Sequence, residues 1–215
     1  AYTQNISISG FQYSLTLQRW HDYDAEVKLA GTGTANSVLT IGSNSAAITI
    51  RDITIARTTN PSGSSQLHGG GICVFMNAST YIDNCTIHDN RAYKGGGLYA
   101  YSSNVEVLNS RFYNNNGLYS GGPLIMQSFG GAIYGENANI IVYGSVLNDN
   151  ASGGLGYGVC DETIFMDGGS LNCVASTLIH DSILAVVATG VNQTFLNCII
   201  YRSEERRVGK ECRSR

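Results

Sequence analysis

The sequence predicts an all-β solenoid, and two phrases that recur along the chain carry this prediction. The first phrase is rich in glycine, and its copies start at Gly69, Gly95 and Gly130, with a weaker copy at Gly156. These starts lie 26, 35 and 26 residues apart. The second phrase ends in asparagine, and its copies occupy residues 84–90, 109–115 and 144–150. Two phrases in fixed order at a near-constant period indicate a repeat architecture.

The composition agrees with an all-β chain of low surface charge. The chain has 215 residues, of which 43% are hydrophobic and only 13% are charged. That charged fraction is about half of the usual one. The sequence contains 26 Gly, 13 Tyr and two Pro, and no apolar run is long enough to span a membrane as a helix. We therefore expect one domain with a sizeable core and no transmembrane helix.

The last fourteen residues, 202–215, differ sharply from the rest. They hold six of the 13 Lys and Arg residues, and they match the translation of a common short-read sequencing adapter. We therefore expect residues 1–201 to form the domain and residues 202–215 to be an artefactual, disordered tail. Without the tail, the chain carries 7 basic and 13 acidic side chains, a net charge of −6. We expect no nucleic-acid partner, because phosphate neutralisation dominates that affinity.

Alternating residues predict short strands along the whole domain. Before the clear repeats, strands are expected at residues 6–8, 13–17, 26–29, 37–41 and 47–55. Each repeat is expected to hold the glycine phrase, a strand, a Ser/Asn turn, a second strand and the asparagine phrase. Residues 58–66 read as a surface loop, and residues 117–129 contain an insertion that explains the 35-residue gap. After the repeats, strands are expected at residues 163–166, 183–187 and 192–200, with a short helix as the alternative at 185–188.

The repeat length predicts the architecture. A period of roughly 25 residues with three short strands is typical of one turn of a parallel β-helix, whose stacked coils share one core. Glycine is expected at corners where φ is positive or backbones approach closely, and asparagine where side-chain amides bond from coil to coil. The predicted corner residues are Gly69, Gly70, Gly71, Gly95, Gly96, Gly97, Gly130, Gly131, Asn90, Asn115 and Asn150.

The five cysteines outside the tail fall into two predicted registers. Cys73 and Cys160 share the glycine-phrase position. Cys85, Cys173 and Cys198 share the asparagine-phrase position and are expected to line an interior column. Neighbours in such a column could form a disulfide only with suitable Cβ geometry, so we favour free buried thiols.

The two phrases resemble the repeat of a known family. The pattern GG(G/A)(I/L)(C/Y), followed some 15 residues later by N-(C/S)-x-(I/F)-x-x-N, is similar to the repeat of polymorphic outer-membrane proteins. More broadly, it resembles right-handed parallel β-helix proteins, and the resemblance covers residues 38–201. It implies an all-β, right-handed parallel β-helix of seven or eight coils. We expect the chain to be a fragment of such a solenoid, open at both ends.

Three residues in equivalent positions of successive repeats are a candidate metal site. Asp89, Asn114 and Asp149 could offer oxygen ligands to Ca²⁺ on one face of the solenoid. They could equally form a corner ladder, which we favour. The four histidines are scattered without the spacing of metal ligands, so no metal and no cofactor are expected.

The densest acidic group consists of Asp161, Glu162 and Asp167. A carboxylate pair can serve as general acid and base, so these would be the catalytic residues if the chain were an enzyme. Polysaccharide lyases that resemble this fold use acidic Ca²⁺ ligands with an Arg or Lys base, so Ca²⁺ would be the cofactor of such an enzyme. Solvated carboxylates in turns are the alternative, and we favour it.

Tyrosines gather in the central coils, at Tyr93, Tyr99, Tyr101, Tyr113, Tyr119 and Tyr134. Aromatic faces with amide neighbours suit carbohydrate or protein contact, whereas stacked tyrosines can simply stabilise a sheet. With the resemblance, this predicts a monomeric, secreted or cell-surface solenoid, in the outer membrane if bacterial. It would be an adhesin-like or structural binding module for carbohydrate or a surface protein. The alternative is a polysaccharide lyase or glycoside hydrolase acting on a pectin-type substrate.

Overall fold

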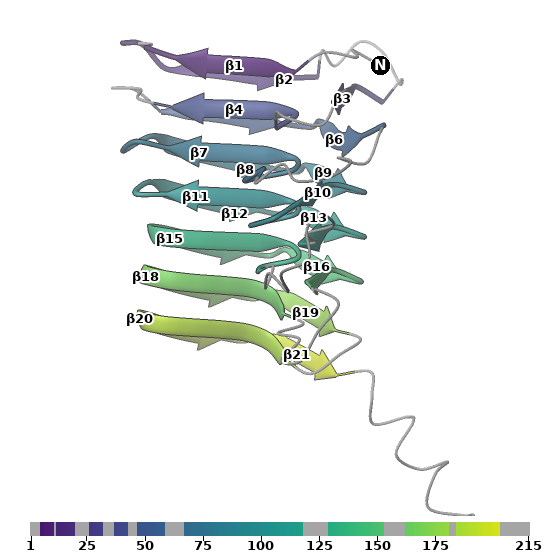
Figure 1. Ribbon diagram of the computed structural model, residues 1–215, viewed down its shortest axis with the longest axis vertical. Coiled ribbons are helices and arrows are strands. Elements are labelled where there is room, and N and C mark those ends of the chain that lie inside the picture. Colours follow the sequence, from purple (N-terminus) through teal and green to yellow (C-terminus); the bar gives the residue numbers. More distant parts are fainter. Residues whose placement is uncertain are drawn as a thin grey trace, which may run out of the picture.

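The computed structural model is a stack of seven coils of parallel strands, which confirms the predicted parallel β-helix (Figure 1). It describes residues 5–10, 12–19, 26–31, 37–42, 47–58, 67–117, 129–152, 162–180 and 184–202. Every strand pair in these ranges is parallel, and no α-helix occurs in them. Of the predicted tail, 202–215, Arg202 is instead the last residue of a strand, and residues 203–215 lie outside the described residues.

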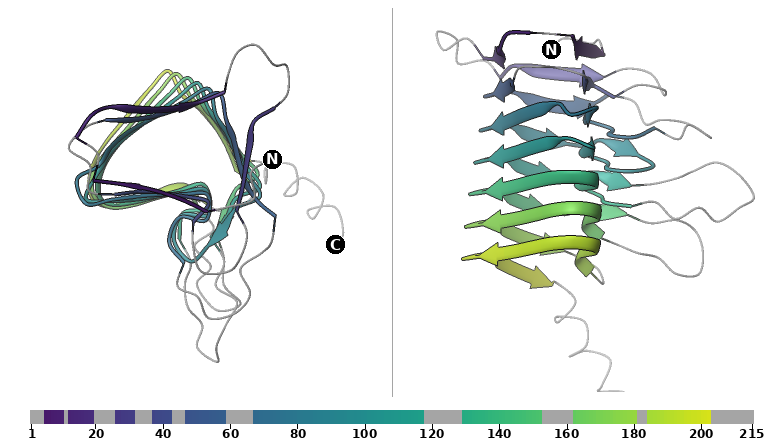
Figure 2. Two further views of the ribbon diagram at one scale, coloured as in Figure 1. Left: turned by 90° about the horizontal axis from the view of Figure 1, so that it is seen from above. Right: turned by 90° about the vertical axis from the view of Figure 1, so that its left-hand side faces the viewer.

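Each coil contributes strands to three sides of the stack, which superimpose when viewed along its axis (Figure 2). The first side holds β1 (Ile6–Ser9), β4 (Leu39–Gly42), β7 (Ile72–Phe75) and β11 (Leu98–Tyr101). The second side holds β2 (Leu15–Gln18), β5 (Ile48–Arg51), β8 (Ser79–Asp83) and β12 (Asn104–Leu108). Three long strands run through both sides: β15 (Ile133–Tyr143), β18 (Glu162–Val174) and β20 (Leu184–Leu196).

The third side is a seven-stranded sheet, one strand from each coil. It consists of β3 (Lys28–Gly31), β6 (Thr54–Arg57), β9 (Thr86–His88), β13 (Arg111–Tyr113), β16 (Val146–Asn148), β19 (Thr177–His180) and β21 (Ile199–Arg202). A small sheet of two-residue strands follows it: β10 (Arg91–Ala92), β14 (Asn116–Gly117) and β17 (Ala151–Ser152).

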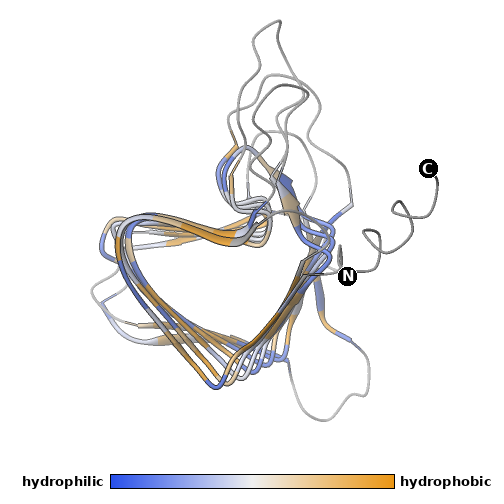
Figure 3. Ribbon diagram, turned by 90° about the horizontal axis from the view of Figure 1, so that it is seen from below, coloured by the Kyte–Doolittle hydropathy of each residue, from blue (hydrophilic) through white to orange (hydrophobic). Residues whose placement is uncertain are grey.

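Every second side chain of a strand points into the core, and the strand register aligns these apolar side chains in rows that run from coil to coil. Leu98 lies between Ile72 and Ile133 in neighbouring coils, and all three are fully buried. Because successive side chains of a strand point to opposite faces, the residues beside these rows point outward. Figure 3 shows hydrophobic and hydrophilic residues alternating along the sides of the coil. This matches the period-two pattern that predicted the strands.

The corner between the second and third sides needs a left-handed residue in every repeat. Asp52, Asn84 and Asn109 have φ of 57°, 51° and 49° there, and Gly144, Ala175 and Asn197 continue the row. Asn, Asp and Gly tolerate this conformation best, which explains their recurrence. The corner at Asp52 also divides the single alternating run predicted at residues 47–55 into two strands, β5 and β6.

The residues after this corner form a ladder in the interior. The backbone N–H of Cys85 donates to Ser110 Oγ, that of Ser110 to Ser145 Oγ, and that of Ser145 to Ser176 Oγ, at 3.0, 3.0 and 3.2 Å. Cys198 follows in register, since Ile199 pairs with Thr177. The small polar side chain at this position therefore satisfies the backbone of the preceding coil.

The predicted register of Cys173 was wrong. Cys173 pairs with Val142 and Phe195, so it lies on the second side, three residues before the ladder position that Ser176 occupies. The phrase had seemed to restart at Asn172, but the left-handed residue in this coil is Ala175, which carries no sequence signal. Cys73, Cys85, Cys173 and Cys198 are all free thiols.

The fourth copy of the glycine phrase was also misplaced. Residues 156–160 lie outside the described residues, but Ile133 pairs with Ile164 and Tyr134 with Phe165. The copy in register is therefore Glu162-Thr163-Ile164-Phe165, which contains no glycine. Phe165, rather than Cys160, takes the position of Cys73 in that coil.

The glycine phrases lie where the small sheet approaches the first side. Gly95 has a φ of 65°, and Gly69 and Gly130 have nearly the same value. The second glycine is required for a different reason, which is that two backbone segments approach each other closely. A Cβ at Gly96 would lie 2.5 Å from the backbone N of Asn116. The third position accepts a methyl group, because Ala132 occupies it in β15's coil.

The predicted corner asparagines form a buried ladder. Asn90 Nδ2 donates to Asn115 Oδ1 at 3.0 Å, and Asn115 Nδ2 donates to Asn150 Oδ1 at 2.9 Å. The same nitrogens donate to backbone carbonyls of the preceding coil, at Ile55 and Ile87. All three side chains are buried, so the ladder supplies partners for polar groups that water cannot reach.

No helix formed by the described residues is long and apolar enough to cross a membrane. At the C-terminal end of the stack, β20 pairs only with β18 and β21 only with β19. Apolar side chains of this last coil are exposed, at Phe195, Leu196, Ile199, Ile200 and Tyr201.

Candidate functional site: an aromatic and charged patch beside the glycine corner

Three of the gaps in the described residues lie at one corner, between the third and first sides of the stack. The described residues end at Thr58, Gly117 and Ser152 and resume at Leu67, Phe129 and Glu162. The intervening residues 59–66, 118–128 and 153–161 lie outside the described residues, and they include the regions where the sequence predicted loops and the insertion. Sequence variation is tolerated best in such connections, so a binding function is expected near this corner.

Beside this corner, an aromatic row runs up the outer surface of the first side. Tyr99, Tyr134 and Phe165 occupy one register position in three successive coils. The rings of Tyr99 and Tyr134 stack at 5.7 Å between centroids, and those of Tyr134 and Phe165 at 5.1 Å. Tyr99 and Tyr134 are only 6% and 2% exposed, although they point away from the core.

The residues just before the glycines complete the patch. His68, Lys94 and Phe129 are connected by isolated parallel bridges, so they too stack from coil to coil. The His68 ring lies 4.7 Å from the Tyr99 ring, and Phe129 lies 4.7 Å from Phe165. We call the set the outer patch; it consists of His68, Tyr93, Lys94, Tyr99, Phe129, Tyr134, Glu136 and Phe165.

A single ion pair lies within the outer patch. Lys94 Nζ is 2.8 Å from Glu136 Oε2, and the Tyr99 hydroxyl donates to the same oxygen at 3.0 Å. The Lys94 ammonium also lies 4.6 Å from the centroid of the Tyr134 ring, a cation–π contact. The Lys94 and Glu136 side chains remain 20% and 26% exposed, so solvent and ligands can reach them.

The pair fixes the charges in the outer patch. Burial alone would raise the pKa of Glu136, but the hydrogen bonds from Lys94 and Tyr99 outweigh it and hold that pKa below its ordinary value. Burial likewise opposes the charge of Lys94, and the hydrogen bond to Glu136 outweighs it and raises the Lys94 pKa. At neutral pH both groups are therefore ionised.

The aromatic and imidazole groups around the pair stay neutral. Burial raises the pKa of Tyr99, and the neighbouring Glu136 carboxylate raises it further. Burial also lowers the pKa of His68, and the positive charge of Lys94 adds to this effect. The outer patch thus presents one fixed carboxylate acceptor and one fixed ammonium donor to solvent, both packed against neutral rings, and such fixed charges suit recognition better than proton transfer.

The structure separates two members of the predicted acidic group, Glu162 and Asp167. Asp161 lies outside the described residues. Glu162 is fully buried at the glycine corner, where its Oε1 accepts from the Gly130 N–H at 3.3 Å. Asp167 is exposed on the outer surface and pairs in register with Glu136. A buried carboxylate and an exposed one, about 16 Å apart along an extended strand, cannot act on one bond.

The three candidate Ca²⁺ ligands lie at equivalent corners of successive coils, and each has a left-handed backbone conformation. Asp89, Asn114 and Asp149 have φ of 53°, 51° and 53°. The Asp89 carboxylate lies 2.6 Å from His88 Nδ1, and the Asp149 carboxylate accepts from Asn148 Nδ2. No group of three or more His, Cys, Asp or Glu side chains in the described ranges could hold a metal ion.

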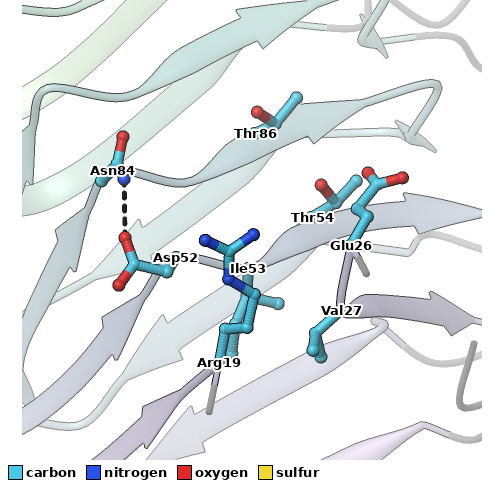
Figure 4. Close-up of a pocket in the computed structure, with 8 residues that line it drawn as sticks. All are labelled: Arg19, Glu26, Val27, Asp52, Ile53, Thr54, Asn84 and Thr86. Carbon is cyan, nitrogen blue, oxygen red and sulfur yellow. Dashed lines mark hydrogen bonds between the residues drawn. The ribbon is translucent and has the colours of Figure 1, made fainter. Parts of the chain in front are cut away.

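A small polar pocket lies at the N-terminal end of the stack (Figure 4). It encloses about 160 Å³, and Arg19 lies in it between the acidic residues Asp52 and Glu26. Asn84 Nδ2 donates to Asp52 Oδ1 at 2.6 Å, and the buried Arg19 Nε has no hydrogen-bond partner. The pocket holds both signs of charge and no aromatic ring, so it offers less for recognition than the outer patch does.

The sequence named part of the outer patch but not its centre. Tyr93, Tyr99 and Tyr134 belonged to the predicted cluster, whereas Glu136 was not singled out and His68 was considered as a metal ligand. The signal for the stack was the shared phrase position of Cys73, Tyr99 and Tyr134. The sequence did not indicate that Phe165 belongs to this row, because its copy of the phrase lacks glycine.

Comparison with known protein families finds one similarity. Residues 5–160 match a family described as a right handed beta helix region. The comparison found no match among curated proteins and none among solved structures.

Proposed function

Because the chain belongs to the right-handed β-helix family, which residues 5–160 match, we propose that it is a binding module rather than an enzyme. In this proposal it is a secreted or cell-surface solenoid, in the outer membrane if the source is bacterial, with an adhesin-like or structural role. Its ligand is a carbohydrate or a surface protein, and a single copy is sufficient to bind it. The fold is common to many activities, so the argument rests on the site.

The observation that carries the proposal is the outer patch. It combines stacked rings with one partly exposed ion pair, beside the corner between the third and first sides. Amphipathic aromatic groups with a few fixed polar partners are typical of recognition sites. The rigid solenoid holds them in place before the ligand arrives, which limits the entropy lost on binding.

The test is binding by the purified chain to an array of glycans and cell-surface proteins. We expect wild-type protein to bind at least one ligand and Glu136→Gln to weaken that binding, because the glutamine removes the charge that holds Lys94. The matched control is Asp83→Asn, which removes the other Lys/Arg–carboxylate pair of the described residues, Arg51–Asp83 at 3.0 Å, far from the outer patch. Binding that is equal in both variants and wild type would refute the role of the outer patch.

Catalysis on a pectin-type polysaccharide remains the competing proposal, and one observation favours it. Glu136 and Asp167 are register neighbours on adjacent strands, so their Cα atoms lie about 4.8 Å apart. A hydrolase would need one of two such carboxylates protonated, yet Lys94 holds the pKa of Glu136 low. A lyase would need a neutral amine as base, yet the pKa of Lys94 is raised.

Incubation with a panel of polyuronates, with and without Ca²⁺, separates the two proposals. We expect no unsaturated product and no new reducing ends. Product that depends on Ca²⁺ and is lost in Asp167→Asn would establish the lyase and overturn the non-catalytic proposal. For the location, we expect an antibody against the chain to label intact source cells or their medium.

A further inference from the structure

A polar groove lies at the corner between the first and second sides of coils three to five. It encloses about 290 Å³, compared with 160 and 180 Å³ for the two other pockets described. Its lining consists of Asn77, Ser102, Ser103, Asn104, Asn137 and Asn139. Every one of these side chains is uncharged and carries hydrogen-bonding groups. The groove therefore favours a ligand that is polar but neutral.

Hydrogen bonds between coils hold the groove rigidly. The Asn77 N–H donates to the Ser102 carbonyl at 2.7 Å, and the Ser102 N–H donates to the Glu136 carbonyl at 2.9 Å. Asn77, Ser102 and Asn137 share a left-handed conformation, with φ of 60°, 45° and 52°. Three successive coils thus repeat one corner shape, and their side chains are spaced by the strand separation of about 4.8 Å.

The amides on the second side of the groove are oriented in one direction. Ser170 Oγ donates to Asn139 Oδ1, and Asn139 Nδ2 donates to Asn104 Oδ1, both at 2.9 Å. Within the described part of the chain, Asn104 Nδ2 makes no hydrogen bond, so its N–H groups remain available. Hydroxyl groups, which donate and accept, are suited to such a row of amides.

An exposed aromatic residue lies next in sequence to the groove lining. Tyr101 directly precedes Ser102, points outward from β11 and is 40% exposed, in contrast to the buried Tyr99. Its register neighbours in the next two coils are Glu136 and Asp167. A ligand that stacks on Tyr101 therefore meets the Glu136 carboxylate, which Lys94 neutralises, and the Asp167 carboxylate, so the net charge nearby is negative and repels an anionic chain. The groove lining itself offers a protein loop no apolar side chain to pack against.

We propose that this groove is a subsite for a neutral sugar residue of a glycan, stacked on Tyr101 and bonded to the amides of Asn104 and Asn139. This rests on the proposed binding function and names the ligand class and the place of contact. Stacking uses the apolar face of the sugar ring, and the amides bond to its hydroxyl groups. The repeat of the corner in three coils lets one glycan chain occupy neighbouring positions along the solenoid axis.

The experiment is affinity electrophoresis of the whole chain in native gels containing one soluble polysaccharide each. The neutral probes are xyloglucan, galactomannan and mixed-linkage β-glucan, and the anionic probe is polygalacturonate. We expect retardation in at least one neutral gel and none in the anionic gel. Tyr101→Ala and Asn104→Ala should each weaken the retention about tenfold, which corresponds to about 1.4 kcal/mol. Tyr101→Phe should retain it, because the ring face is kept.

Two matched variants control for surface changes alone. Tyr143→Ala removes an exposed tyrosine of the second side, and Asn172→Ala removes an outward amide of β18. Both should bind as wild type does. Circular dichroism and thermal unfolding should be the same for all five variants, since none of these side chains belongs to the core.

The outcomes separate this inference from the proposed function. Retardation by no neutral probe, or by polygalacturonate, overturns the inference. Neutral retention that survives both Tyr101→Ala and Asn104→Ala also overturns it, because the subsite then lies elsewhere. If the ligand is a protein, and Glu136→Gln abolishes its binding whereas Tyr101→Ala and Asn104→Ala do not, the proposed binding function is supported and the neutral-sugar subsite is refuted.

Discussion

Replacing the central rung of the asparagine ladder, Asn115→Ala, should destabilise the solenoid more than replacing the first rung, Asn90→Ala. The Asn115 side chain takes part in four hydrogen bonds. It donates to the Ile87 carbonyl and to Asn150 Oδ1, and its Oδ1 accepts from the N–H and Nδ2 of Asn90. The Asn90 side chain takes part in only two, to the Ile55 carbonyl and Asn115, because its own Oδ1 has no partner.

The magnitudes follow from this difference. A net intramolecular hydrogen bond contributes about 1 kcal/mol, so Asn115→Ala should cost about 4 kcal/mol and Asn90→Ala about 2 kcal/mol. Both side chains are about 1% exposed, so water cannot replace the lost partners. The orphaned donors of Asn90 make the first value a lower bound rather than an upper one.

Urea unfolding at neutral pH, followed by circular dichroism, measures the two free energies of unfolding. Because neighbouring coils contribute to stability almost additively, the midpoints of both variants can be compared directly with that of wild type. Asn172→Ala, which changes an outward amide, is the control and should shift the midpoint little. Equal losses at Asn115 and Asn90, or a loss below about 1 kcal/mol at Asn115, would contradict the assignment of the ladder as a source of stability.

Three further predictions concern the glycine corner, the ion pair and the thiols. Gly96→Ala should cost about 2–3 kcal/mol in urea unfolding, because its Cβ would meet the backbone of Asn116 at 2.5 Å and β14 would have to shift; a neutral result would contradict the close approach. Glu136→Gln should cost about 1 kcal/mol or less at pH 7. Since the folded-state pKa of Glu136 is depressed, this cost should be complete above its ordinary value of 4.5 and be lost as the pH falls from that value through the lower folded-state pKa; a cost that grows on acidification would contradict this linkage. The thiols of Cys85 and Cys173, whose pKa values burial raises to about 11 and about 12, should react with Ellman's reagent at pH 8 only after unfolding; rapid labelling of native protein would show that they are accessible.

The fold could be predicted because its determinants are local and repeated. Alternating apolar residues bury one row per coil, and the positive φ at Gly95 and Asn84 can be inferred from residue type alone. The same reasoning failed where a corner is occupied by a residue type that does not itself indicate a corner. Ala175 takes the left-handed corner, and Glu162 takes a glycine position, so the registers of Cys173 and of the fourth glycine phrase were misplaced.

The candidate site could be predicted only in part, because most of its contacts join positions 25 to 42 residues apart. That Tyr99 and Tyr134 recur in one phrase position is visible in the sequence, and it indicates stacking. That Lys94 reaches across Tyr134 to Glu136 is not, because the two residues belong to different parts of different repeats. Proximity between coils depends on the exact register, which the 35-residue repeat obscures.

By itself, the sequence determined the solenoid: the period, the strands, and the corners held by glycine and asparagine, since each depends on residue type and spacing along the chain. Only the tertiary structure decided which outward side chains meet. In the folded chain Glu162 is buried at the glycine corner, whereas Asp167 is on the surface. Likewise, Tyr99 is buried, whereas Tyr101 is exposed. Those distinctions arise from stacking one coil on the next, and burial and charge at a site are properties of that stack rather than of any single repeat.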